Sequence, residues 1–165
     1  MKKQLLYAFI SLITFSCNNN NDAAPAGAGK NESGGSNTSK NASFTVDGKT
    51  YKGNVRTQYF GDKATGAFSV LCQQDEPLAL LQAVFANESD PATHENLNPR
   101  ESYFSMNPGD VHLSLSGEAI GPNEFVSSGY NDGTIRVKDH VLIIDKFKLY
   151  SKVDGEKTVS SSIPF

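Results

Sequence analysis

The sequence predicts an all-β fold, an antiparallel β-sandwich of hairpins over residues 43–165, preceded by a signal peptide and a flexible tether. Turn-forming pairs recur along this region, and the segments between them alternate apolar and polar residues with a period of two. The turn pairs are Asp47-Gly48, Pro108-Gly109, Asp132-Gly133 and Asp154-Gly155. Short strands at turn-marked intervals are typical of a sandwich, although the same pattern is also compatible with a small closed barrel.

The chain begins with a predicted signal peptide, residues 1–16. Two lysines precede an apolar run at residues 5–15, which is too short to cross a membrane, because a spanning helix needs about 20 apolar residues. Cys17 follows, and MKKQLLYAFISLITFSC resembles the signal of bacterial lipoproteins. The resemblance implies cleavage just before Cys17 and acylation of its sulfur, with the lipid bilayer as partner. Thr14 and Phe15 stand where the usual motif has leucine and a small residue.

Two other interpretations of this start remain open. Secretion in soluble form would need a small-x-small cleavage site just after the apolar run, but Ala24-Pro25-Ala26 lies about ten residues too far along. An uncleaved membrane anchor is the other. The lipoprotein interpretation implies a protein of the cell envelope, at the outer membrane of a Gram-negative bacterium. Its periplasmic or surface face stays undecided, because Asp22 alone is a weak export signal.

The segment after the signal, residues 17–42, is a predicted flexible tether. After Cys17 it contains no Val, Ile, Leu, Phe or Tyr, so nothing in it offsets the entropy of ordering the backbone. A Gly-, Ser- and Asn-rich coil of this length spans about 28 Å, which would hold the domain clear of the lipid headgroups.

The first half of the domain reads as two hairpins. Asp47-Gly48 lies inside SFTVDGKTYKG, and this pair suits a type I′ turn, in which both central residues have positive φ. The alternation in FSVLC predicts the next strand, where Cys72 is in phase with Phe68 and Val70 and is therefore expected to be buried. QQDEP then closes a turn to a strand at residues 77–86, although the helix formers in PLALLQAVFA leave a helix as the alternative.

The second half predicts three more strands. VHLSLS alternates cleanly, and GTIRV and VLIIDKFKLYSK form a hairpin across a short loop. Polar and apolar residues alternate in the latter only after Asp145. We therefore expect either burial on both faces before that residue or a β-bulge near it. The last strand follows Asp154-Gly155 and ends at Phe165.

The two ends of the domain resemble a family of small β-rich envelope lipoproteins of unknown function. The resemblance rests on FTVDGKTYKG at the start and on DGTIRV and DGEKTVSSSIPF at the end. It implies a β-sandwich and brings no inherited activity.

No catalytic, cofactor or metal motif stands out, and we expect a protein that is not an enzyme and binds neither a cofactor nor a metal. His94, His112 and His140 share no metal-ligand spacing, and no serine lies in a Gly-x-Ser-x-Gly turn. We expect the three histidines to be surface residues, with His112 on the polar face of its strand. A formal net charge of -3 without a Lys/Arg cluster argues against nucleic-acid binding.

The predicted function is a binding or structural interaction module for an unknown envelope protein or glycan. Residues 87–101 form a long connection, which is expected to be either functional or a tolerated mobile insertion. Arg100 and Tyr103 lie at its exit, and both residue types are enriched in interface hot spots. The lack of Trp weakens a sugar-stacking role, but Tyr can also stack. The alternatives are a small envelope enzyme such as a hydrolase, which needs titratable groups in a cleft, and a lipocalin-like carrier, which needs an enclosed apolar cavity.

Overall fold

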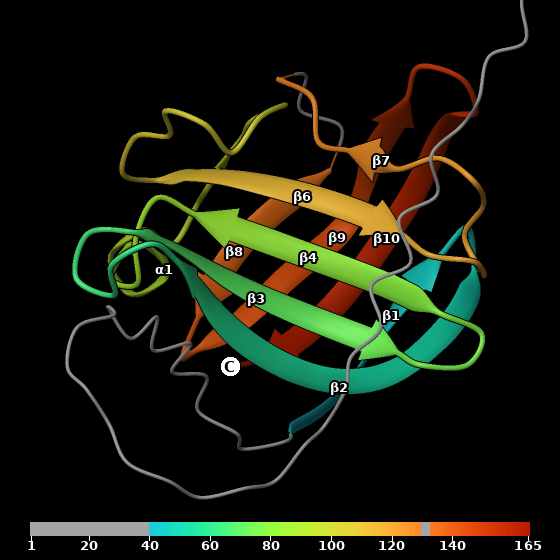
Figure 1. The fold of residues 1–165 in the computed structure, drawn as a ribbon, viewed down its shortest axis with the longest axis horizontal. Helices are drawn as coiled ribbons and strands as arrows, with labels where there is room; N and C mark the ends of the chain where they lie inside the picture. The colour runs from blue at the N-terminus through green and yellow to red at the C-terminus, as the bar shows by residue number, and fades with distance from the viewer. Residues whose placement is uncertain (1–39, 130–132) are drawn as a thin grey trace, which may run out of the picture. The chain divides into compact units, whose positions relative to one another are not determined.

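The computed structural model describes residues 40–129 and 133–165, so the predicted signal peptide, Cys17 and most of the tether lie outside the described residues. Within this part of the chain no helix is long and apolar enough to cross a membrane. The elements in chain order are β1 (Lys40–Val46), β2 (Lys49–Phe60), β3 (Ala67–Gln74), β4 (Ala79–Phe85), α1 (Asp90–Thr93), β5 (Asn98–Pro99), β6 (Asp110–Ser116), β7 (Phe125–Val126), β8 (Thr134–Lys138), β9 (Val141–Ser151) and β10 (Gly155–Pro164) (Figure 1).

The strands form a closed antiparallel barrel. The ring runs β10, β1, β2, β3, β4, β6, β7 and β9, and β9 pairs again with β10. Outside this ring of eight strands, β8 pairs with β9 and the short β5 runs parallel to the start of β6. The all-β antiparallel prediction is confirmed. The sandwich is not, because β10 pairs with both β1 and β9, and the pairing with β9 closes the sheet into a ring.

Strand β2 has the curvature that this closure requires (Figure 1). It is twelve residues long and carries Gly53 in its middle. A Cβ atom at Gly53 would lie 2.3 Å from the carbonyl carbon of Gln73 on β3, which no side chain could accept without movement of the backbone. The glycine therefore permits a close approach of two backbones at the bend.

The turn predictions hold where the structure describes them. Asp47 and Gly48 have φ values of 50° and 84°, as a type I′ hairpin requires. Gly109 has a φ of 86°, and the backbone N–H of Asp110 donates to the carbonyl of Asn107, which forms the expected type II turn. Asp132 lies outside the described residues.

The two uncertain strand assignments are also resolved. Residues 79–85 form β4, so the helix alternative for that stretch is wrong. A bulge does lie near Asp145, since Phe147 faces Val159 whereas Ile144 faces Ser161. Lys146, inside the bulge, has a φ of 47°.

Apolar side chains fill the inside of the barrel. Cys72 is completely buried among them, as predicted. The largest fully buried side chains are Phe44, Phe85, Phe125, Phe147, Leu81, Leu113, Leu115, Leu142, Ile144, Leu149, Ile163 and Val70. Because these side chains come from strands all round the ring, the core is one continuous cluster.

Candidate functional site

Part of the outer face of the barrel is covered. Outward-facing side chains of an antiparallel sheet are normally solvated, yet Ser69, Val84, His112 and Ser114 are at most 6% exposed. Three of them lie in one row across neighbouring strands, because Ser69 faces Val84 and Val84 faces His112. The prediction that His112 is a surface residue is therefore wrong. A chain segment at residues 100–103 covers it, since both Arg100 and Tyr103 contact His112.

Tyr103 lies on this segment, directly above the covered row. Its ring centroid is 5.7 Å from that of His112 on β6 and 6.2 Å from that of Phe60 on β2. The strands β3 and β4 lie between β2 and β6, so Tyr103 contacts side chains on both strands that flank this pair. Tyr103 is 44% exposed and Phe60 is 43% exposed. Both rings are available for further contacts.

A groove of about 420 Å³ lies beside these rings, and we name it the outer groove. Its lining comes from the outer faces of β2, β4, β6 and β7 and from residues 101–103 and 124. The polar side chains among them are Gln58, Gln82, Glu101, Ser102, His112, Ser114 and Glu124. Pockets of this size are in the range that holds small ligands.

The hydrogen bonds in the floor of the outer groove leave several acceptors free for a ligand. The side-chain N–H of Gln82 donates to the hydroxyl oxygen of Ser69, so the side-chain carbonyl oxygen of Gln82 stays available as an acceptor. Nδ1 of His112 lies 3.1 Å from the carbonyl oxygen of Arg100, which can only accept, so Nδ1 carries the proton. In the neutral ring Nε2 is then an acceptor.

The backbone of Arg100 fixes where the segment enters the groove. Its N–H donates to the carbonyl of Val111, and its carbonyl accepts from His112 and from the buried hydroxyl of Ser127 at 2.6 Å. The side chain of Arg100 is half exposed and lies 3.7 Å from the carboxylate of Asp110. Of the two residues predicted for interaction, Tyr103 lines the outer groove, whereas Arg100 is not among its lining residues and contacts His112 and Ser127 through its backbone carbonyl.

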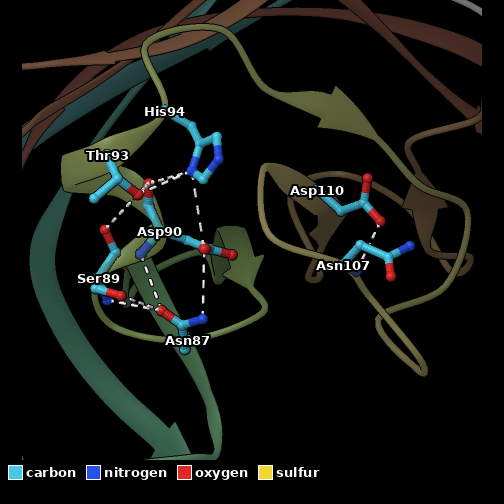
Figure 2. Close-up of polar contacts among 7 residues, drawn as sticks. All are labelled: Asn87, Ser89, Asp90, Thr93, His94, Asn107 and Asp110. Atoms are coloured by element: carbon cyan, nitrogen blue, oxygen red, sulfur yellow. Dashed lines mark hydrogen bonds and ion pairs between the residues drawn. The ribbon is translucent and has the colours of Figure 1, made fainter.

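The connection before Arg100 is held against β8, the strand that pairs with β9 outside the closed ring. Leu97 donates to the carbonyl of Ile135, and Val137 donates to the carbonyl of Glu95, so this stretch pairs with β8. Figure 2 shows how its start is held, with the side-chain oxygen of Asn87 accepting from the backbone of Ser89 and Asp90. Such hydrogen bonds explain why so long a connection is ordered.

Figure 2 also shows a polar cluster around Asp90, which contains a buried oxygen atom that lacks a hydrogen-bond partner in the described part of the chain. Asp90 is 2% exposed, and its Oδ1 lies 3.4 Å from Asn87 and 3.9 Å from Nδ1 of His94. Its Oδ2 has no hydrogen-bond partner within the described residues. No group of three or more His, Cys, Asp or Glu side chains in residues 40–129 and 133–165 is placed to hold a metal ion.

A smaller cavity of about 260 Å³ lies at the end of the barrel that carries α1, and its lining includes Tyr59, Lys63, Glu88, His140 and Phe165. Tyr59 donates to Glu88 at 2.5 Å, and burial together with this carboxylate raises the pKa of Tyr59 to about 12. A phenol with so high a pKa stays protonated near neutral pH and cannot act as a base. The ring of His140 packs edge-on against Phe165.

Sequence reasoning selected Tyr103 but missed the polar floor, which includes Gln58, Gln82 and Ser114. Each of these residues occupies an ordinary outward position in its own strand, and only the pairing of β2, β3, β4 and β6 brings them together.

No known family model, curated protein or solved structure matches the chain.

Proposed function

We propose that this protein is a lipid-anchored lipoprotein of the bacterial cell envelope whose barrel binds an envelope partner in the outer groove. The anchor is argued from the apolar run and the position of Cys17 alone. The observation that supports binding is the half-exposed ring of Tyr103 above a buried polar floor. An exposed aromatic ring beside convergent hydrogen-bonding groups is a common arrangement in binding sites.

The alternatives find less support. A lipocalin-like carrier needs an empty apolar interior, whereas large side chains such as Phe85 and Phe147 occupy the inside of this barrel. A hydrolase would need a base or a nucleophile in a cleft. In the cavity beside Tyr59, burial and the carboxylate of Glu88 raise the pKa of the phenol to about 12, so it cannot serve as that base. In the described part of the outer groove, the hydrogen bond of His112 goes to the backbone carbonyl of Arg100 and not to a serine or a glutamate. The acidic side chains of the outer groove give no support to nucleic-acid binding.

The experiment that tests the groove is cross-linking in whole cells, with products detected by both protein and glycan stains. Tyr103→Ala in the full chain should reduce partner recovery about tenfold or more, because an aromatic hot spot is lost. Val153→Ala is the matched control, since Val153 is a 77% exposed apolar side chain outside the outer groove. Equal recovery with Tyr103→Ala and the wild type would exclude the outer groove as the binding surface.

A further inference from the structure

We propose that the outer groove binds a saccharide that carries no acidic group. This inference rests on the proposed function of the same groove and names its class of ligand. Three properties of the groove lead to it: its aromatic surface, its hydrogen-bonding groups and its charge.

The aromatic surface is a cluster of three exposed rings. Tyr103 lies 4.4 Å from Phe104 and 6.2 Å from Phe60, measured between ring centroids, and Phe104 is 73% exposed. Contiguous exposed apolar side chains can mark an interaction site, whereas single exposed ones need no explanation. The C–H face of a sugar ring is apolar and flat enough to pack on such a ring, whereas its edge carries hydroxyl groups.

The hydrogen-bonding groups beside the rings match those hydroxyls. The carboxylates of Glu101 and Glu124 and the free carbonyl of Gln82 accept hydrogen bonds, and Gln58 and Ser114 can both donate and accept. A sugar offers several hydroxyl donors and acceptors within a few ångströms of one another. A mixed set of side chains in one groove can therefore bind it at several points.

The charge of the groove decides which saccharides fit. Glu101 and Glu124 are acidic, and no Lys or Arg is among the residues that line the described groove. The nearby Arg100 has Asp110 as its counter-ion at 3.7 Å. A uronate, a sulfate or a phosphate would meet like charge without compensation, which weakens its binding. Neutral sugars and amino sugars meet no such penalty.

The pairing of the strands argues against a peptide in this groove. Extended peptides usually bind a sheet by adding a strand to an open edge. Under the outer groove, β3 pairs with β2 and β4, and β4 pairs with β3 and β6. A peptide therefore cannot add a strand to the sheet in this groove, whereas a saccharide needs no open edge to bind.

The test measures binding of three trisaccharides to the purified full chain by saturation-transfer NMR. The probes are cellotriose, which is neutral, the glucosamine trimer, which is basic, and the galacturonic acid trimer, which is acidic. We expect transfer to the ring C–H protons of the first two, and an affinity at least about tenfold lower for the acidic trimer. Tyr103→Ala should lower the affinity for cellotriose about tenfold or more, whereas Val153→Ala should leave it unchanged.

The charge argument has its own variant. The double variant Glu101→Gln, Glu124→Gln removes both carboxylates without loss of volume. It should reduce the difference in affinity between the basic and the acidic trimer. The saccharide inference would be overturned if the wild type bound neither cellotriose nor the glucosamine trimer. The proposed function would then still stand if Tyr103→Ala reduces partner recovery in cells, and would fall with it if recovery is unchanged. Equal binding of the acidic trimer would also overturn the inference.

Discussion

At the scale of single residues, Cys72 shows how a strand pattern alone can predict an environment. Its phase with Phe68 and Val70 predicts burial, and the structure confirms this, with Cys72 completely buried on β3. Burial raises the pKa of its thiol from 9.0 to about 11, because the thiolate would lose its solvation. The thiol is therefore inert as a nucleophile near neutral pH in the folded protein.

This raised pKa predicts a loss of stability in alkali. The folded state holds the proton of Cys72 more tightly than the unfolded state, so the contribution is complete below pH 9 and is lost as the pH rises through 11. By pH 10 the loss is about 1.4 kcal/mol, the equivalent of one pKa unit. Denaturant unfolding of the wild type and of Cys72→Ala at pH 8 and pH 10 measures it. A difference in unfolding free energy that stays constant between the two pH values would contradict the prediction.

Ser127 gives a second prediction at this scale. Its buried hydroxyl donates to the carbonyl of Arg100 at 2.6 Å and accepts from the N–H of Leu113 at 2.9 Å. Ser127→Ala leaves the N–H of Leu113 without this partner, which should lower the unfolding free energy by about 1–3 kcal/mol. Ser162→Ala, at an exposed position, is the control and should change it little. Equal stability of the two variants would show that the hydroxyl is not needed to hold the segment.

At the scale of elements, the hairpins could be predicted and the closure of the sheet could not. Asp47 and Gly48 determine their turn locally, through the positive φ values that both adopt. The pairing of β1 with β10 joins residues such as Phe44 and Ser161, more than a hundred positions apart, and no local pattern encodes it. Gly53 is a glycine within a strand, a feature that often marks a sharp bend, but it does not show which strands meet.

The bend in β2 should therefore be sensitive to Gly53. Gly53→Ala places a Cβ atom 2.3 Å from the backbone of Gln73, so β2 and β3 must separate or the bend must relax. We expect a loss of about 1–3 kcal/mol in the unfolding free energy, as for other overpacked sites. Lys52→Ala, at the exposed neighbouring position, is the control. Thermal or denaturant unfolding measures both variants, and a Gly53→Ala protein as stable as the control would show that the bend tolerates a side chain.

At the scale of the whole molecule, the candidate site depends on how distant parts of the chain meet. Tyr103 could be selected from the sequence because it follows a long connection and is a hot-spot residue type. Its partners Phe60 and His112 could not, since they belong to strands that meet only through two intervening strands. The length of the connection predicts a functional or mobile segment, whereas the structure holds it by hydrogen bonds of Glu95 and Leu97 to β8.

The last prediction concerns how the barrel is held in the cell. If Cys17 carries the acyl chains, Cys17→Ala should abolish labelling by a radioactive fatty acid and move the protein from the membrane fraction to soluble or uncleaved forms. The variant should keep the melting temperature of the domain, because the described strands of the barrel begin only at Lys40 in the sequence. Cys72→Ala is the matched control, since its buried thiol should accept no acyl chain and its loss should leave the labelling intact. Absence of label from the wild-type protein would contradict the lipoprotein proposal. Loss of label from both cysteine variants would indicate an effect on export and not acylation of Cys17.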